Sequence, residues 1–464
     1  MFKFKDKNQT GRAAIIFLFL ILVSFSAVFA RITNLPTLLP VLGIIAALVG
    51  IIITFINTDF ALIVLIFSML LSPEIPVAQL PERSVVIRID DILLIFIFFT
   101  WFAKMAINNQ LGVLRKSPVN RPLLIYILIS VVFTFLAISF GIGKAKFNTA
   151  FFYIIKYTEY LMLYFFVANN MHELGQYRKF LFFFLLVCFI VCIYGYTQIA
   201  SGTWRVTAPF EGERPEPNTL AGYLLIILAI IAGLFLHAKT LPWKIFLAAS
   251  CVFIFPVFVY TLSRGGYVGF IVMYLALIFF SKKKKIFLSG LLVCLIILSP
   301  LILPTEVITR VRKTFVGTKR YEVLGTSIAL EESAAARLET WEYVGEVFSK
   351  SPVFGNGVTG IEFVDTQYGR ILGELGLIGM AVFLWLAYAL FKNSLKIYHN
   401  CEDWMIQGIS LGFLVSLIAL LVMSLGANVF IIVRIMEPFW FIAAMVLMSP
   451  EIIKERKPQE VLGT

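Results

Sequence analysis

The sequence has 464 residues, of which 60% are hydrophobic and only 14% are charged, and its mean hydropathy is +0.92. An ordinary soluble domain carries about 25% charged residues, so this composition excludes that class and indicates an integral membrane protein. The formal net charge of +12 does not indicate nucleic acid as a partner, because the basic residues are spread over many short loops instead of forming one surface.

Apolar stretches recur along the whole chain at lengths that suit a lipid bilayer. One helical crossing needs roughly 17 to 25 apolar residues, and about fourteen stretches reach or approach this length. We therefore predict an all-α integral membrane protein with about 12–14 transmembrane helices, forming a single polytopic domain over residues 1–464. The predicted spans are 13–30, 38–56, 60–71, 91–107, 122–140, 151–168, 180–200, 218–236, 245–262, 266–280, 286–303, 371–391, 406–427 and 430–448.

The distribution of Lys and Arg predicts the orientation, because positively charged loops stay on the cytoplasmic side. With the N-terminus in the cytoplasm, most basic residues of the short loops, including the run Lys282–Lys285, fall on that side. Both termini are then predicted to be cytoplasmic. The first span, 13–30, ends at Val28-Phe29-Ala30, which a signal peptidase can accept, but its length favours a retained anchor.

By the same parity, the one long segment between spans, residues 304–370, is predicted to be extracytoplasmic. Apolar residues recur in it at three- and four-residue spacing, which predicts an amphipathic helix that covers a cavity or the bundle surface. These residues are Ala334, Leu338, Trp341, Val344 and Phe348.

Motifs for nucleotide or zinc chemistry do not occur, and the three His lie in predicted cytoplasmic loops. We therefore expect neither a cofactor nor a metal site. Charged side chains at the outer ends of spans need another explanation, because an isolated charge there is costly. Inside the span 151–168, Lys156 and Glu159 lie three residues apart, which favours a structural pair within one helix over a place on a substrate pathway.

Three groups of residues stand at the predicted outer face. In the first, Arg205 and Arg214 precede Pro217-Asn218, where a span opens, although Pro and Asn also suit a plain helix start. In the second, Ser263-Arg264-Gly265 presents the planar donor fork of arginine, which suits phosphate. The third group comprises Arg337, Trp341, Pro352–Gly357, Asp365, Tyr368, Glu374 and Gly376.

In this order, the three groups resemble the O-antigen ligase and polymerase superfamily of bacterial envelope proteins, over residues 200–390. The resemblance implies a GT-C-like glycosyltransferase. Its substrate would be a glycan on an undecaprenyl pyrophosphate carrier at the outer leaflet, used without nucleotide sugar or essential metal. Catalytic roles are implied for Arg205 and Arg264 at the leaving diphosphate and for Asp365 at the acceptor hydroxyl. The implied substrate-binding residues are Arg337, Arg214, Ser263, Tyr368 and Glu374.

Asp365 separates the two branches of this superfamily. Ligases tend to carry His at this place and polymerase-like members Asp, so the residue favours polymerisation of repeat units. A carboxylate with a pKa of about 4 is a poor base at neutral pH unless burial raises that pKa, so Asp365 either accepts the proton or only orients the acceptor. Glu374 is expected to stabilise its loop and helix start.

We therefore expect a polymerase-type glycosyltransferase of the cytoplasmic membrane, acting in O-antigen, exopolysaccharide or capsule biosynthesis. The alternatives are ligase-type transfer of the glycan to an acceptor and, in a different class, a transporter or flippase for lipid-linked glycans. Expected partners are the undecaprenyl-pyrophosphate-linked glycan and membrane lipid, with room for a chain-length regulator protein and with no nucleic acid. An enzyme requires Arg205, Arg264 and Asp365 at one outer mouth, whereas a transporter requires a site at the membrane midplane.

Overall fold

The computed structural model describes most of the chain. The predicted spans 13–30 and 38–56, and with them the anchor or signal at the N-terminus, lie outside the described residues. The candidate Arg214 also lies outside them. The described residues are 57–79, 84–107, 115–212, 215–281, 284–302, 305–313, 319–323, 326–330 and 332–461.

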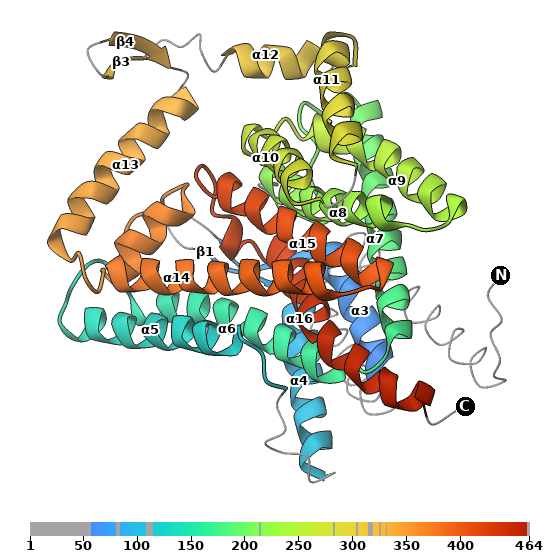
Figure 1. The fold of residues 1–464 in the computed structure, drawn as a ribbon. Helices are drawn as coiled ribbons and strands as arrows, with labels where there is room; N and C mark the ends of the chain where they lie inside the picture. The colour runs from blue at the N-terminus through green and yellow to red at the C-terminus, as the bar shows by residue number, and fades with distance from the viewer. Residues whose placement is uncertain are drawn as a thin grey trace, which may run out of the picture.

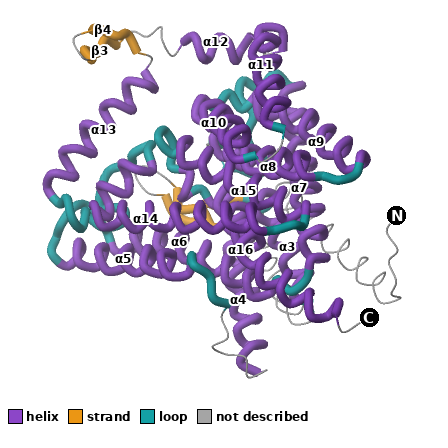
Figure 2. The backbone as a smooth tube through the Cα atoms, viewed as in Figure 1, coloured by secondary structure: helices purple, strands orange, loops and turns teal. Residues whose placement is uncertain are grey.

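The described chain forms a bundle of α-helices with two short β-hairpins (Figures 1 and 2). Both hairpins are antiparallel, one of β1 (Glu74–Gln79) with β2 (Ser84–Arg88) and one of β3 (Lys319–Val323) with β4 (Thr326–Leu330). The helices are α3 (Thr58–Leu71), α4 (Ile89–Ile107), α5 (Asn120–Ser139), α6 (Phe147–Asn170), α7 (Leu174–Ala200), α8 (Pro217–His237), α9 (Leu241–Tyr260), α10 (Arg264–Phe280), α11 (Lys285–Ile302), α12 (Thr305–Lys313), α13 (Glu332–Lys350), α14 (Gln367–Asn400), α15 (Trp404–Met423) and α16 (Val433–Val461), with a 3₁₀ turn at Val429–Ile431.

The all-α membrane class predicted from the sequence is confirmed. Each predicted span from 60–71 onward has a helix at its place, and the two hairpins are additions that apolar periodicity did not predict. Within the described residues, eight helices are long and apolar enough to cross a membrane, and α10 is among the shorter apolar ones. The eight are α5, α6, α7, α8, α9, α14, α15 and α16.

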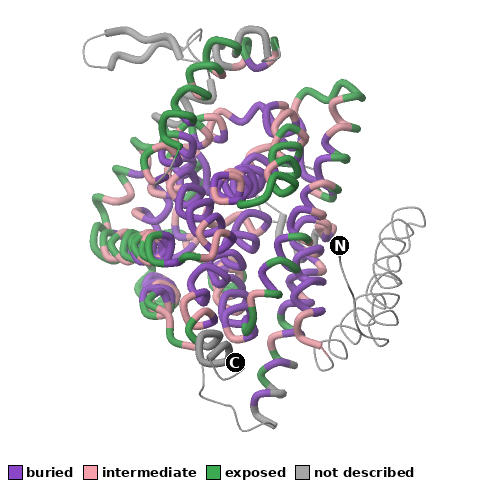
Figure 3. Tube along the Cα trace, turned by 45° about the vertical axis from the view of Figure 1, so that its right-hand side comes forward, coloured by how far each residue is buried: buried purple, intermediate pink, exposed green. Residues whose placement is uncertain are grey.

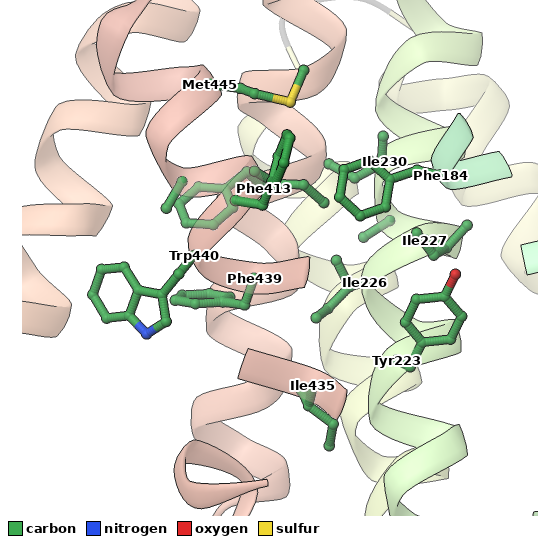
Figure 4. Packing of buried hydrophobic residues seen from close by; sticks show 14 of the residues in the cluster. Phe184, Tyr223, Ile226, Ile227, Ile230, Phe413, Ile435, Phe439, Trp440 and Met445 are labelled. Atoms are coloured by element: carbon green, nitrogen blue, oxygen red, sulfur yellow. The ribbon is translucent and has the colours of Figure 1, made fainter. Parts of the chain in front are cut away.

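Buried residues, purple in Figure 3, gather in the middle of the bundle. Helices α8, α15 and α16 are the most buried of the eight candidate membrane spans and form this centre. In the apolar stretches of α8 and α16, 89% of the residues are buried inside the protein, against 33% for α5 and α9. The central helices pack through large apolar side chains, such as Ile230, Phe413 and Phe439 in Figure 4. Helices that leave two thirds of an apolar stretch uncovered suit a lipid environment, so α5 and α9 lie at the periphery.

Glycine allows α8 and α15 to approach closely. A Cβ atom on Gly233 of α8 would lie 2.2 Å from the carbonyl oxygen of Gly408 and 2.7 Å from the nitrogen of Gly412, both on α15. Small residues spaced four apart are a common basis of helix contact in membranes, because they let backbones touch. This contact fixes two helices whose ends reach the candidate site.

Helices α12 and α13, which follow α11 in the chain, stand outside the main bundle, with α12 along the top of Figure 1 and α13 at its upper left. Only part of the apolar face predicted for α13 packs against the bundle. Val344 is 2% exposed and lies beside Gly369 of α14, whereas Trp341 is 39% exposed. Helix α13 therefore meets the bundle near the start of α14.

Charged side chains inside the bundle are paired. Lys156 lies 3.4 Å from Glu159 on the same helix, and it also pairs with Asp91 of α4. Arg88 bonds Glu437 of α16 over 3.0 Å. The pair expected within α6 is thus present, but as part of a network that joins α4, α6 and α16.

Candidate functional site

A pocket of about 230 Å³ lies where several helix ends and loops meet. Six separate parts of the chain contribute: the loop after α7, the start of α8, the start of α10, helix α12, the loop before α14 and the loop after α15. The residues that line it are Arg205, Asn218, Leu262, Arg264, Gly265, Arg310, Asp365, Gly426 and Ala427.

Arg205 is held by the backbone that leads into α10. Its Nε donates to the carbonyl oxygen of Thr261 over 3.1 Å, and the neighbouring amide of Val206 donates to Tyr260 over 3.0 Å. Burial, followed by the nearby positive charges of Arg310 and Arg264, lowers the pKa of Arg205. The guanidinium group is thus fixed at a position that favours an incoming anion.

Arg264 is the first residue of α10. Leu262 adopts a left-handed conformation with φ of 49°, and the Ser263 side chain caps the helix by accepting from the amide of Gly266 over 3.1 Å. This turn points the N-terminal end of α10 at the pocket, where Arg264 and Gly265 form part of the lining. The positive end of a helix adds to the attraction that the arginines exert on an anion.

Asp365 stands in the loop before α14 and is exposed. Its position is fixed by contacts between that loop and the chain after α15: Asn428 donates to the carbonyl of Val364, and the amide of Gln367 donates to Ser424 over 3.1 Å. These bonds bring a carboxylate to the side of the pocket formed by Gly426 and Ala427.

Arg310 of α12 lines the pocket from the first part of the long segment between α11 and α14, the segment that also carries Asp365. It places a third guanidinium beside Arg205, as its effect on the pKa of Arg205 indicates. Three arginines against the single carboxylate Asp365 leave the lining with a formal excess of two positive charges. That balance suits a doubly or multiply charged oxyanion such as a diphosphate.

Residues 249–384 match the O-antigen ligase family. The resemblance seen in the sequence is thereby confirmed for this region, which runs from α9 into α14 and includes Arg264, Arg310 and Asp365. No curated protein matches the sequence.

Two motifs within the region that matches the O-antigen ligase family, Pro352–Gly357 and Glu374–Gly376, pack on each other. The amides of Asn356 and Gly357 donate to the carbonyls of Gly373 and Glu374 over 3.0 and 2.8 Å. At Gly376 the long helix α14 is interrupted, with φ of 63°, and a Cβ atom there would lie 2.4 Å from the carbonyl of Val353. The glycines of both motifs therefore serve a close backbone contact, which sets the start of α14 and with it Asp365.

Glu374 and Tyr368, both candidates for substrate binding, make contacts within the protein and do not line the pocket. Glu374 is buried, lies 3.1 Å from Nε of Arg370 and accepts from the amide of Thr359 over 2.9 Å. The hydroxyl of Tyr368 donates to the carbonyl of Leu421 over 2.8 Å. Glu374 thus joins the loop at Thr359 to α14, and Tyr368 joins α14 to α15.

Three further candidates have different positions. Ser263 is fully buried, and its hydroxyl donates to Oδ1 of Asn218 over 2.7 Å, so Asn218 and not Ser263 faces the pocket. Arg337 belongs to α13, but its side chain lies outside the described residues, and Arg214 lies outside them altogether.

Among the described residues, no group of three or more His, Cys, Asp or Glu side chains is placed to hold a metal ion.

A buried arginine, Arg434, holds the loop that carries Arg205. Arg434 at the start of α16 is 2% exposed and donates to four backbone carbonyls, two at the end of α3 and two in the loop after α7. Its Nε lies 3.4 Å from Glu74, which in turn accepts from the amide of Gly212 over 3.0 Å. Burial raises the pKa of Glu211 in the same loop to about 8, despite the opposing charge of Arg434.

Sequence reasoning found Arg205, Arg264 and Asp365 but missed Arg310 and the pocket role of Asn218. Arg310 stands in a basic stretch beside the membrane, a pattern typical of contact with lipid head groups. Asn218 follows Pro217 at a helix start, where asparagine has a common structural use. Only the fold brings both to the same pocket.

Proposed function

We propose that this protein is a polymerase-type glycosyltransferase that joins undecaprenyl-pyrophosphate-linked oligosaccharide repeat units at the outer face of the cytoplasmic membrane. The observation that carries the proposal is the convergence of Arg205, Arg264 and Arg310 with Asp365 in one pocket at the helix ends. The match of residues 249–384 to the O-antigen ligase family supports the same class of chemistry.

In the proposed reaction, the hydroxyl oxygen of the acceptor sugar forms a bond to the anomeric carbon of the donor. The bond from that carbon to the phosphate oxygen breaks, and the carrier diphosphate leaves with the electron pair. Negative charge therefore grows on the diphosphate in the transition state. Arg205, Arg264 and Arg310 are preorganised donors at the place where this charge develops, which is the arrangement that lowers such a barrier.

Asp365 is proposed to receive the acceptor. As an exposed carboxylate beside the arginines, it accepts a hydrogen bond from the attacking hydroxyl and orients its oxygen toward the anomeric carbon. The proton of the hydroxyl leaves through Asp365 to water or to the departing diphosphate. The carboxylate also limits the excess positive charge, so that the product diphosphate can dissociate.

The size of the pocket indicates which part of the substrate it binds. Drug-sized ligands occupy cavities of about 300 to 1,000 Å³, whereas this pocket has about 230 Å³. It suits the diphosphate and the adjoining sugar, with the remaining glycan outside. The arginine pocket is therefore proposed to recognise the diphosphate, and recognition of the whole repeat unit depends on the surrounding surface.

Ligase-type transfer is the second candidate, since the matching family model is described as O-antigen ligase. The difference lies in the acceptor and not in the arginines that hold the leaving group. Transport of a lipid-linked glycan fits less well, because the pocket is formed by loops and helix ends beneath α12 and not by the middle of spanning helices.

We also propose a GT-C-like architecture in one domain, with both termini cytoplasmic and residues 304–370 on the outer side. The pocket supports this orientation, because Arg205, Arg264, Arg310 and Asp365 belong to segments that the basic-loop pattern assigns to the outer face. A chain-length regulator protein would bind outside the pocket.

The decisive experiment uses the full chain in proteoliposomes with an undecaprenyl-pyrophosphate-linked repeat unit and no nucleotide. A polymerase produces longer carrier-linked glycans together with free undecaprenyl pyrophosphate, both measurable by mass spectrometry. Products that form only after a separate acceptor is added would indicate a ligase. Movement of the lipid between leaflets without any new glycosidic bond would overturn the enzymatic proposal.

A further inference from the structure

Asn218 is the one uncharged polar side chain in the lining of the arginine pocket. It is the second residue of α8 and is partly buried. We propose that the Nδ2 group of Asn218 donates a hydrogen bond to an oxygen of the bound diphosphate, and that Ser263 sets the orientation of this amide. The inference rests on the proposed function and adds a substrate contact to it.

The orientation follows from the hydrogen bonds of the Ser263 hydroxyl, which has one hydrogen to donate and two lone pairs. It accepts from the amide of Gly266 over 3.1 Å and donates to Oδ1 of Asn218 over 2.7 Å. The carbonyl side of the Asn218 amide is thereby directed at the buried serine. The NH₂ side is then the part of the amide that can donate to a ligand in the pocket.

The bond between Ser263 and Asn218 also argues against a role confined to the start of α8. A capping side chain bonds the backbone of its own helix, whereas Asn218 bonds a residue 45 positions away in the chain. Helices α8 and α10 lie close together at this point, since a Cβ atom on Gly266 would lie 3.0 Å from that of Ala221. Asn218 is therefore held between the two helix starts that border the pocket.

A neutral donor complements the charged ones. Arg205 already experiences the positive charges of Arg264 and Arg310, and a fourth cation in the lining would add to this repulsion. An amide adds a donor for a phosphate oxygen without adding charge. A hydrogen bond to a charged group contributes more than one between neutral groups, so its loss should be measurable in binding.

The substitution Asn218→Asp separates substrate binding from a structural role. Aspartate keeps an oxygen that accepts from Ser263, and a negative charge in the first turn stabilises a helix. It removes only the NH₂ donors and places a carboxylate against the diphosphate. A carboxylate in direct contact with the diphosphate repels it strongly, whereas one that points away into the fold acts from a distance and is screened. If Asn218 serves the fold alone and does not contact the ligand, the dissociation constants of the variant should therefore stay within about twofold of wild type.

The test measures dissociation constants of farnesyl pyrophosphate and inorganic pyrophosphate by calorimetry on the full chain in nanodiscs, with farnesol as the uncharged control. We expect Asn218→Asp to weaken binding of both diphosphates by about tenfold or more, and Asn218→Ala by about tenfold. Ser263→Ala should weaken binding in the wild-type background but not in Asn218→Ala, because the two residues act through one contact. Ser449→Ala, which removes a fully buried hydroxyl from α16, should leave both constants unchanged.

Dissociation constants within twofold of wild type for Asn218→Asp, together with a large loss for Arg264→Ala, would overturn this inference and leave the proposed function intact. Absence of diphosphate binding by the wild-type protein would instead contradict the proposed function. If Asn218→Asp lowers the unfolding temperature, the double-mutant cycle of Ser263→Ala and Asn218→Ala tests the inference instead. Additive losses of diphosphate binding in that cycle would contradict a shared contact.

Discussion

The Nε of Arg205 donates a hydrogen bond to the backbone carbonyl of Thr261 over 3.1 Å. This bond joins the loop after α7 to the turn that begins α10, so two of the three arginines of the pocket, Arg205 and Arg264, are fixed relative to each other although they are far apart in the sequence. Preorganisation of this kind is what a site for developing negative charge requires.

Removal of either arginine should abolish polymer formation. We expect Arg205→Ala and Arg264→Ala each to lower the rate by about a hundredfold or more, because loss of one preorganised donor has an effect of this order. Arg205→Lys should be intermediate, since lysine keeps the charge but not the planar fork that reaches Thr261. Glycan length on gels and rates from mass spectrometry measure the effect. Arg178→Ala, an exposed arginine at the start of α7, is the control, and normal chain lengths in the pocket variants would refute the assignment.

Asp365→Asn distinguishes proton transfer from orientation. A general base contributes about 10² to 10⁴ in rate, whereas an asparagine at the same place still accepts a hydrogen bond from the hydroxyl. Because Asp365 is exposed, we expect a moderate loss of about tenfold. The measurement is the turnover rate at saturating lipid-linked donor. A complete loss in a correctly folded variant would show that the carboxylate is the base.

Arg434→Met should destabilise the protein. The substitution leaves Glu74 and four backbone carbonyls without the guanidinium that joins them, and loss of one partner of a buried ion pair costs about 3–5 kcal/mol. Thermal unfolding of the purified protein in detergent measures this loss. Lys396→Met removes an exposed cation from α14 and should leave the unfolding temperature nearly unchanged. Equal shifts for the two variants would contradict the role given to Arg434.

Glu211 should make stability depend on pH. Its pKa is raised from the ordinary 4.5 to about 8 in the folded protein, mainly by burial. Between these values the unfolded chain releases the proton while the folded protein keeps it, so the contribution of Glu211 to stability is full below pH 4.5 and is lost as the pH rises toward 8. The glutamine side chain of Glu211→Gln stays neutral at every pH. The unfolding temperature of this variant, relative to that of wild type, should therefore rise between pH 4.5 and 8. Parallel curves for the two proteins would contradict the assignment.

Hydropathy predicted the helices of this protein well, because a bilayer imposes a minimum length and apolarity on every crossing. It located the short helices α3 and α10 and placed the start of α8 within one residue. It did not predict the kink at Gly376, which depends on the backbone of Val353 approaching from another segment. Contacts between distant segments leave no periodic signal in the sequence.

The sequence also predicted part of the site, but not the contacts between distant segments. Arg205, Arg264 and Asp365 stand in ordered motifs, and all three line the pocket. Ser263 belongs to the same motif as Arg264, yet its hydroxyl is buried against Asn218. A motif shows that a residue is needed near the site but not which way its side chain points, since that direction depends on the packing of α8 against α10.

The pocket draws residues from Arg205 in one half of the chain to Ala427 near its other end. During synthesis at the ribosome, the first arginine is inserted into the membrane long before the loop after α15 emerges. A nascent chain therefore has no assembled binding site until most of its helices are in place. A partly synthesised chain is therefore expected neither to bind the lipid carrier in this pocket nor to catalyse the transfer.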